Sequence, residues 1–390
     1  GMATEKSPMR LGWRWIRSFA RRPRAWCSRL SGERKALGAM VTGMAAVAWV
    51  SSSSYARAED QRFTEEDLMD QFHEHACKDV ESKMRLSELI KSLEPNDYKD
   101  TRDLDESEMQ KVKEALSKFF PYVKGKGDPL LTLDDYLMVL ALLSVSPFDY
   151  EIVCKIVDKS GEGCIELNEY TKMIACLLPN MGIHHPVALP SYVPMFGEDG
   201  HTSLTYEQLK SNWLEFRQVL REALFNRLDV NREGYISGGA FARYQLSYGP
   251  SDRLLKFENR ISQEKNKEVS EKRVSKAEFL KYEQMLDAHE NIERAVSLFN
   301  VANKPFGKHE FNHLIHGVIG IDFSPDMLDV LFTTYDNDGD GQLSGVELQH
   351  ALQSTAMHGV TAHNQQGWLE TTFGCMKDCF DSEIGYRFRS

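Results

Sequence analysis

The chain has 390 residues, 42% of them hydrophobic, which is enough to bury a core and suggests two or three domains. Its formal net charge of −11 is unevenly distributed, because residues 1–57 hold eleven Lys or Arg and two acidic residues, whereas the remaining 333 residues hold 36 basic and 56 acidic ones. This acidic body argues against a nucleic-acid partner, which needs a basic face. Seven cysteines spread over this length exclude a disulfide scaffold.

The N-terminal segment is rich in arginine and tryptophan. Eight arginines lie between positions 9 and 35, and Glu33 is the single acid among them, a composition typical of a mitochondrial presequence over residues 1–35. A basic surface helix of the mature fold is the alternative. Residues 36–57 follow as a hydrophobic segment and linker, in which the uncharged stretch 36–50 is short for a membrane span of about 20 residues. It is either a retained anchor or part of a cleaved signal; as an anchor, the positive-inside bias would place the body in the intermembrane space.

From residue 60 onward the chain contains an eightfold repeat. Each copy has an apolar residue, a small or polar residue, two variable positions, then usually an acid followed by an aromatic residue or leucine. The apolar residues of the eight copies are Met84, Leu131, Ile165, Leu204, Ile236, Val274, Phe306 and Leu343. A helix-loop-helix unit cannot bury its own apolar face, so an even number predicts paired units stacked into lobes. Successive pairing joins the copies at 306 and 343, but the others could shift by one.

The third copy contains a loop with oxygen-bearing side chains at regular spacing. Residues 158–169 place a glycine at position 6 and oxygen ligands at positions 1, 3, 5, 7 and 12, which are Asp158, Ser160, Glu162, the carbonyl of Cys164, and Glu169. This is the pattern of an EF-hand loop, which surrounds Ca²⁺ with six to eight oxygens. Because Ser160 and Glu162 are poorer ligands at their positions, we expect weaker binding here than at the last loop. A loop that keeps its shape but binds no metal is the alternative.

Two later segments are expected to be irregular, and a third resembles a calcium loop without its last ligand. Residues 179–200 are rich in proline and glycine, which predicts a linker between an N-terminal region and lobe (60–178) and a C-terminal lobe (201–357). Residues 263–276 are charged and poor in apolar residues, which favours an exposed loop. The loop 229–240 begins with Asp229 but ends in Ala240, so it lacks the bidentate carboxylate and favours a structural role.

Residues His309 to His313 match the HExxH pattern of zinc hydrolases. Glu310 and Phe311 are, however, the acid and aromatic residue of the seventh repeat, and no third ligand follows at the usual offsets. We therefore do not expect an enzyme.

The last copy carries the most complete loop, residues 336–347. Its oxygen ligands at positions 1, 3, 5, 7, 9 and 12 are Asp336, Asp338, Asp340, the carbonyl of Gln342, Ser344 through a water molecule, and Glu347. Gly341 stands at position 6, where the chain turns sharply with positive φ. With the loop at 158–169, this predicts two Ca²⁺ sites in an all-α fold of paired EF-hands in two lobes with short β-bridges. A C-terminal helix is expected at 363–382, with Cys375 and Cys379 forming an interchain disulfide or remaining free thiols.

With two metal-competent loops far apart and degenerate hands between them, the chain resembles the EF-hand mitochondrial calcium uptake family, which regulates the mitochondrial calcium uniporter. The resemblance covers about residues 60–380. It also rests on the sequence from Met195 to Gly200 followed by Leu204-Thr205-Tyr206-Glu207, on the sequence from Gly320 to Pro325, and on the cysteine-bearing terminal helix. The run of lysines that some members carry before the body is replaced here by residues 56–60.

The resemblance implies a protein of the mitochondrial intermembrane space, associated with the inner membrane, that contacts the uniporter pore subunit and dimerises with itself or with a paralogue. It implies a gatekeeper that blocks uptake at low Ca²⁺ and permits it at high Ca²⁺. The implied calcium ligands are Asp158, Ser160, Glu162, Glu169, Asp336, Asp338, Asp340 and Glu347. Two alternatives are a passive calcium buffer and a regulatory module similar to that of mitochondrial aspartate/glutamate carriers. The sequence shows no later apolar spans for a carrier region, which counts against the second.

Overall fold

A computed structural model of the chain describes residues 65–77, 83–95, 98–124, 127–147, 150–180, 183, 187–188, 193–248, 251–262, 264–300 and 307–348. The chain divides into two units, Gly1–Arg62 and Phe63–Ser390, and every described residue belongs to the second. The expected presequence, the hydrophobic segment and the C-terminal helix with Cys375 and Cys379 lie outside the described residues. Within the described part, no helix is both long enough and apolar enough to cross a membrane.

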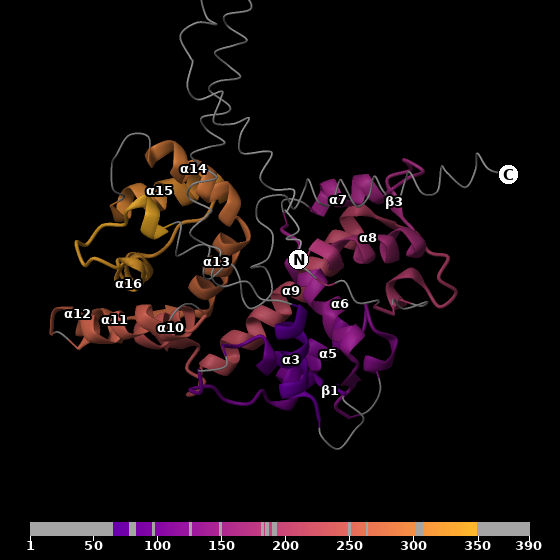
Figure 1. The fold of residues 1–390 in the computed structure, drawn as a ribbon, viewed down its shortest axis with the longest axis horizontal. Coiled ribbons are helices and arrows are strands. Elements are labelled where there is room, and N and C mark those ends of the chain that lie inside the picture. The colour runs from indigo at the N-terminus through magenta and orange to yellow at the C-terminus, as the bar shows by residue number, and fades with distance from the viewer. Residues whose placement is uncertain are drawn as a thin grey trace, which may run out of the picture. The chain divides into compact units, whose positions relative to one another are not determined.

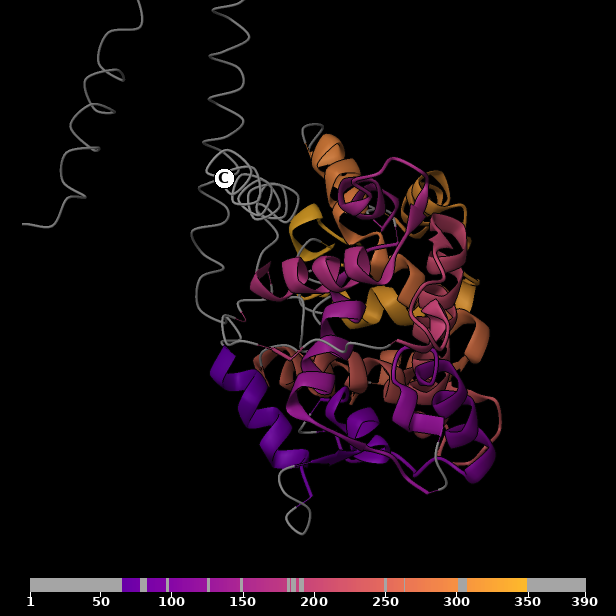
Figure 2. The ribbon, with the colours of Figure 1, turned by 90° about the vertical axis from the view of Figure 1, so that its right-hand side faces the viewer.

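Helices make up most of the described chain, and the strands between them are short (Figures 1 and 2). The helices of the first half are α3 (Glu65–His75), α4 (Leu86–Ser92), α5 (Glu106–Leu116), α6 (Leu133–Ser144), α7 (Tyr150–Val157), α8 (Leu167–Asn180) and α9 (Tyr206–Leu228). Those of the second half are α10 (Gly238–Leu246), α11 (Ser251–Ile261), α12 (Glu264–Glu271), α13 (Lys276–Asp287), α14 (His289–Asn300), α15 (Lys308–Ile319) and α16 (Pro325–Tyr335). The described residues also include the 3₁₀ helices η3 (Pro121–Lys124) and η4 (Pro194–Phe196). Residues 345–348 are also helical.

Within the part of the chain that the structure describes, six strands form three antiparallel pairs, each joining two successive repeats. The strands are β1 (Met84–Arg85), β2 (Leu130–Leu131), β3 (Cys164–Ile165), β4 (Leu204–Thr205), β5 (Tyr235–Ser237) and β6 (Arg273–Ser275). The apolar residues of the repeat face each other or lie in register: Met84 with Leu131, Ile165 with Leu204, and Ile236 with Val274. Successive pairing therefore holds for the first six hands. The partner expected for Leu343, Phe306, lies outside the described residues.

The small or polar residue of the repeat caps the helix that follows at four of the hands. Thr132 caps α6 and Thr205 caps α9, and each forms a capping box with the side chain three residues later, Asp135 or Gln208. Each threonine side chain accepts a backbone N–H at the start of the helix, while the third helical side chain accepts the N–H of the cap. Ser237 and Ser275 accept the N–H three residues on in the same way at α10 and α13. In these four copies the polar position thus satisfies backbone groups that a helix start leaves unpaired, whereas Arg85 and Gly307 form no such bond.

The buried apolar side chains form two main clusters that meet within α9. The first cluster runs from Leu68 to Leu224, and the second runs from Phe225 to Leu348. Figure 1 shows α9 with α3 and α5 to α8 on one side and α10 to α16 on the other. We expected the lobes to divide at residues 179–200, but the hands on either side of that segment are joined by β3 and β4 and share the first cluster. The change from one core to the other falls inside α9 because this helix serves the fourth hand at one end and the fifth at the other.

The expectation of an exposed loop at 263–276 is wrong, because this segment contains α12 and β6. Val269 of α12 packs against the second cluster, and a Cβ added at Gly238 would come within 2.6 Å of the Val269 carbonyl oxygen. A low content of apolar residues therefore conceals a helix held by close backbone contact with α10.

Candidate calcium-binding loops

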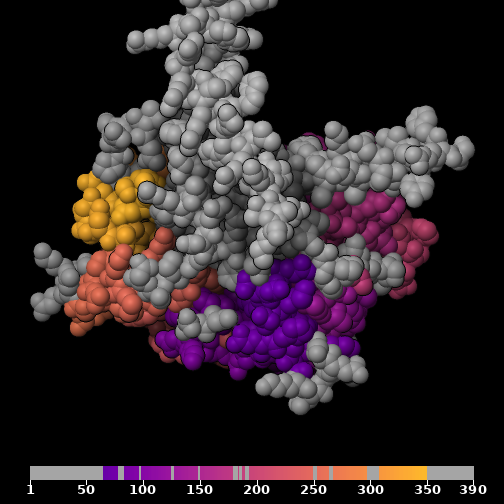
Figure 3. All heavy atoms as spheres, in the orientation of Figure 1, coloured from indigo at the N-terminus to yellow at the C-terminus, as the bar shows by residue number. Residues whose placement is uncertain are grey.

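The loop at 336–347 brings three carboxylates together. Asp336, Asp338 and Asp340 each offer an oxygen within 4.8 Å of the others, the one such group of three among the described residues. Asp336 is buried at the end of α16, whereas Asp338 and Asp340 are exposed. The last described segment, yellow in Figure 3, lies at the surface on the face shown there. Three negative charges this close repel one another unless a cation lies among them.

Hydrogen bonds inside the loop hold these carboxylates in place. Asp336 accepts the backbone N–H of Gly339 through Oδ1 at 2.6 Å and that of Gly341 through Oδ2 at 2.8 Å. Gly341 has φ of 82°, a left-handed conformation that glycine adopts without strain. The loop is therefore held in its turn by hydrogen bonds from its own backbone N–H groups.

The terminal glutamate closes the loop from the other side. Glu347 accepts the N–H of Asn337 at 2.8 Å and both the N–H and the hydroxyl of Ser344, at 3.0 and 2.8 Å. Burial raises the pKa of Glu347, but the hydrogen bonds from Ser344, Asn337 and Asp338 outweigh it and leave the pKa below its ordinary value. A charged carboxylate is what a hard divalent cation requires, so the residues at positions 1, 3, 5 and 12 fit Ca²⁺.

The loop at 158–169 shares this backbone arrangement but has fewer carboxylates. Asp158 accepts the N–H groups of Gly161 and Gly163 at 2.7 and 2.8 Å, and the Ser160 hydroxyl at 3.0 Å. Glu169 accepts the N–H of Lys159 at 3.1 Å and that of Glu166 at 3.1 Å. Ser160 supplies a hydroxyl where the last loop has Asp338, which explains why no third carboxylate gathers around Asp158.

The remaining predicted ligands of the two loops differ in their exposure and in the secondary structure around them. Glu162 is exposed, and Cys164 is half-buried in β3, where it faces Thr205. Gln342 is exposed, and Ser344 precedes the helical residues 345–348. Their roles as ligands stay predictions.

A tyrosine lies beside the first ligand of the 158–169 loop, and this contact was not predicted from the sequence. Tyr206, the first residue of α9, donates its hydroxyl to Oδ2 of Asp158 at 2.7 Å. This hydrogen bond is the main reason that the pKa of Asp158 falls to about 2. Burial and the same bond raise the pKa of Tyr206 to about 12. Tyr206 belongs to the motif Leu204-Thr205-Tyr206-Glu207, but the motif does not reveal which side chain it meets.

The degenerate loop at 229–240 keeps the calcium-loop backbone without the terminal ligand. Asp229 accepts the N–H groups of Glu233 and Gly234 at 2.9 and 2.7 Å. Ala240 stands where the other loops have glutamate, and its N–H donates to Ser237 at 3.1 Å. The loop therefore shares the hydrogen bond from the glycine at position 6 with the other two loops, but its second bond comes from position 5 and not from position 4. Its structural role stays a prediction.

The HExxH residues lie on α15 with both histidine side chains exposed. The rings of His309 and His313 are stacked with centroids 6.4 Å apart. Glu310 is also exposed, and the described His, Cys, Asp and Glu residues form no group of three around this pair. The arrangement is that of two histidines one turn apart on a helix surface.

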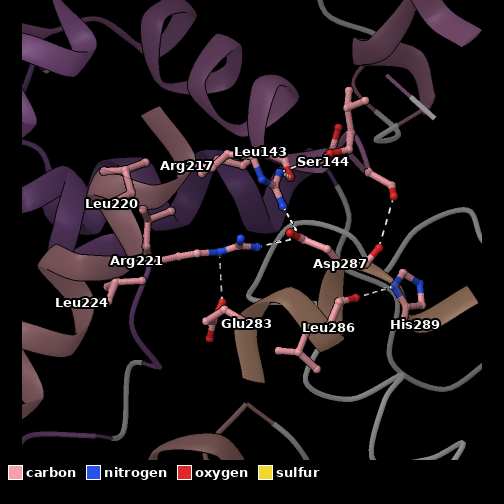
Figure 4. A pocket seen from close by; sticks show the side chains of 13 residues that line it. Leu143, Ser144, Arg217, Leu220, Arg221, Leu224, Glu283, Leu286, Asp287 and His289 are labelled. Carbon is pink, nitrogen blue, oxygen red and sulfur yellow. Dashed lines mark hydrogen bonds and ion pairs between the residues drawn. The ribbon is translucent and has the colours of Figure 1, made fainter. Parts of the chain in front are cut away.

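A buried charged cluster joins α9 to α13, and the sequence did not predict it. Arg217 and Arg221 both pair with Asp287 (Figure 4). The Arg221 guanidinium lies 2.6 Å from Asp287 and 3.4 Å from Glu283. Arg217 donates further to the carbonyl of Val145 at 3.2 Å. These side chains line a cavity of about 110 Å³ together with leucines from α6, α9 and α13.

Paired helix-loop-helix units, short strand pairs between their loops and two acidic twelve-residue loops define an EF-hand protein. Solved structures show the same fold. The apo structure of the mitochondrial calcium uniporter protein MICU2 matches with a TM-score of 0.58 and 20% identity, covering 84% of this chain and 99% of that one. The structure of EFHA2 in the apo state matches with a TM-score of 0.54 and 20% identity, covering 75% and 97%.

Proteins with related sequences indicate a more specific family than the solved structures do. Calcium uptake protein 1, mitochondrial, of Danio rerio is 24% identical over 343 residues, which are 77% of this chain and 68% of that protein. The calcium uptake protein 1 homolog of Caenorhabditis elegans is 24% identical over 273 residues, 64% of this chain and 50% of that protein. The chain thus spans about half the length of some curated relatives it matches. A comparison with models of protein families gives no match. The resemblance to the mitochondrial calcium uptake family is confirmed by these relatives.

Proposed function

We propose that this chain is a calcium-sensing regulatory subunit of the mitochondrial calcium uniporter, which blocks uptake when calcium is low and permits it when calcium rises. The main support is the loop at 336–347, whose three carboxylates converge within 4.8 Å, in a chain similar to calcium uptake protein 1 over 77% of its length. The proposed role is regulatory rather than enzymatic. It includes a location in the intermembrane space at the inner membrane, contact with the pore subunit, and a dimer with itself or a paralogue.

Two calcium sites belong to this proposal. Bound Ca²⁺ would supply the positive charge that offsets repulsion among the loop carboxylates. Sensor loops of this type bind with dissociation constants of about 10⁻⁷ to 10⁻⁵ M. The proposed ligands are Asp158, Ser160, Glu162, Cys164 and Glu169 in the first loop, and Asp336, Asp338, Asp340, Gln342, Ser344 and Glu347 in the second.

The position of Glu347 links its carboxylate to the second core. In this structure the carboxylate is held by N–H groups of Asn337 and Asp338 and by Ser344. The next residue, Leu348, is 2% exposed and belongs to the second cluster. A change in the position of the Glu347 carboxylate would therefore displace the helical turn at residues 345–348. Because Leu348 is packed in the second core, calcium binding at the loop could change the packing of the whole lobe.

The test is a pull-down of the uniporter pore subunit by the full chain, in calcium and in a calcium chelator. The wild-type chain is expected to bind the pore subunit differently in the two conditions, and Glu169→Gln combined with Glu347→Gln is expected to remove the difference. Asp229→Asn is the matched control, because its loop lacks the terminal glutamate and its response should equal the wild type.

Three results would contradict the proposal. A calcium response retained in the double variant would exclude gating through these loops. Calcium binding without any change in pore contact would indicate a buffer, and capture of a carrier in place of the pore would indicate a carrier module.

A further inference from the structure

A side chain from a hand without metal ligands reaches the first ligand of the 158–169 loop. Tyr206 is half-buried at the start of α9 in the fourth hand, and its hydroxyl lies 2.7 Å from Oδ2 of Asp158 in the third. The pairing of β3 with β4, in which Cys164 faces Thr205, places Tyr206 next to that loop. Asp158 itself is 7% exposed, so its carboxylate depends on protein partners for its hydrogen bonds.

The other hands show that this contact is not a general product of pairing. Asp229 and Asp336, which also begin such loops, accept two backbone N–H groups from their own loops, as Asp158 does. The residue in the fifth hand's partner that corresponds to Tyr206 is Lys276, whose ammonium group lies 5.7 Å from the ring centroid of Phe225. The corresponding residue for the last hand is Lys308, which pairs with Asp329 on α16. Each lysine thus interacts with the helix that enters its partner loop, and Tyr206 alone of the three donates to the first carboxylate.

The two oxygens of Asp158 have different neighbours. Oδ2 accepts the Gly163 N–H at 2.8 Å and the Tyr206 hydroxyl at 2.7 Å. Oδ1 accepts the Ser160 hydroxyl at 3.0 Å and the Gly161 N–H at 2.7 Å. Ser160 is the proposed ligand at position 3, so Oδ1 is the oxygen on the side of the other ligands. Oδ2 is the oxygen that Gly163 and Tyr206 hold in place.

We infer that Tyr206 is a positioning residue that holds the Asp158 carboxylate with Oδ1 toward the metal ligands, so that calcium affinity at 158–169 depends on the metal-free fourth hand. The inference rests on the proposed calcium binding at this loop. Partners that orient a ligand in this way typically change metal affinity by about 10- to 100-fold when removed. Because Gly163 still holds Oδ2 after the hydroxyl is lost, we expect about a tenfold loss, at the lower end of that range.

The experiment measures calcium binding by isothermal titration calorimetry on the full chain with Glu347→Gln, which silences the last loop. In this background Tyr206→Phe, which removes the hydroxyl and keeps the ring, should weaken binding about tenfold. Tyr170→Phe is the matched control, because Tyr170 lies in the exiting helix of the same hand and its buried hydroxyl has no partner among the described residues. It should leave the affinity unchanged. Glu169→Gln should abolish the remaining binding.

Thermal unfolding with and without calcium separates positioning from a general loss of stability. A purely structural role for the hydroxyl would lower both midpoints equally, whereas positioning reduces the increase that calcium produces. Equal affinity with and without Tyr206→Phe would overturn the inference, and so would tighter binding, which would mean that the hydroxyl competes for Asp158. A Glu347→Gln chain that binds no calcium would instead contradict the proposed 158–169 site itself, and the inference with it.

Discussion

Asp287→Asn is expected to destabilise the fold strongly, because Asp287 is the shared anion of two arginines. Its side chain is 9% exposed, and that of Arg217 is 8% exposed. Removing one partner of a buried ion pair costs about 3–5 kcal/mol, since an uncompensated charge stays buried. Arg221 keeps Glu283 at 3.4 Å, which reduces the penalty, so we expect a loss of about 3 kcal/mol in the free energy of unfolding. Denaturant unfolding in calcium-free buffer, followed by far-UV circular dichroism, measures it.

A neighbouring ion pair on α14 provides the control. Glu290 and Arg294 lie 3.3 Å apart with side chains 37% and 70% exposed, so Glu290→Gln should cost less than about 1 kcal/mol. The combination Arg217→Met with Asp287→Leu should recover part of the loss, because only Arg221 then needs an anion and Glu283 supplies it. If Asp287→Asn costs no more than Glu290→Gln, the α9–α13 cluster contributes nothing to stability and the reasoning fails.

Two further predictions concern pH and packing. Burial raises the pKa of Asp287, but Arg217 and Arg221 outweigh it and depress the pKa below its ordinary value of 3.8. A depressed carboxyl pKa contributes stability above the unfolded-state pKa and loses it as pH falls through the folded-state value. The stability difference between wild type and Asp287→Asn should therefore shrink below about pH 4, and a difference that stays constant to pH 2 would contradict this. Phe279 is fully buried against Phe225 and Phe241, so Phe279→Ala should cost about 3–5 kcal/mol. A loss below about 1 kcal/mol in denaturant unfolding would show that this core repacks.

The features that the sequence predicted are those encoded over short distances. One repeat contains the apolar strand residue, the helix cap and the glutamine or acid that completes the cap, so Leu204, Thr205 and Gln208 together specify a strand end and a helix start. The loop at 336–347 was predictable for the same reason, because its ligands and its turn glycine lie within twelve residues. The all-α fold of paired hands with short strand pairs is confirmed by the structure and by the solved structures with the same fold.

What could not be predicted depends on contacts between distant segments. Nothing in the local sequence indicates that Arg217 and Arg221 are buried, because the packing of α13 against α9 is what places them beside Asp287. Tyr206 is 48 residues from Asp158 along the chain, and its contact follows from which strands pair. The expected boundary at 179–200 relied on prolines and glycines, which mark a break in regular structure but do not show which cores lie on either side.

The long helix α9 links the third hand, which carries the proposed calcium loop at 158–169, to the hands that form the second core. Its 23 residues contain neither proline nor glycine, so it has none of the residues at which helices usually kink. Its first residue donates to Asp158, its middle is paired with α13 through Asp287, and Arg227 near its end pairs with Glu94. A displacement at Asp158 that moved α9 as a rigid unit would therefore disturb the buried ion pairs of Arg221 with Asp287 and of Arg227 with Glu94. The hands that lack a complete set of ligands supply parts of the two cores that meet within this helix, which is a structural role that requires no bound metal.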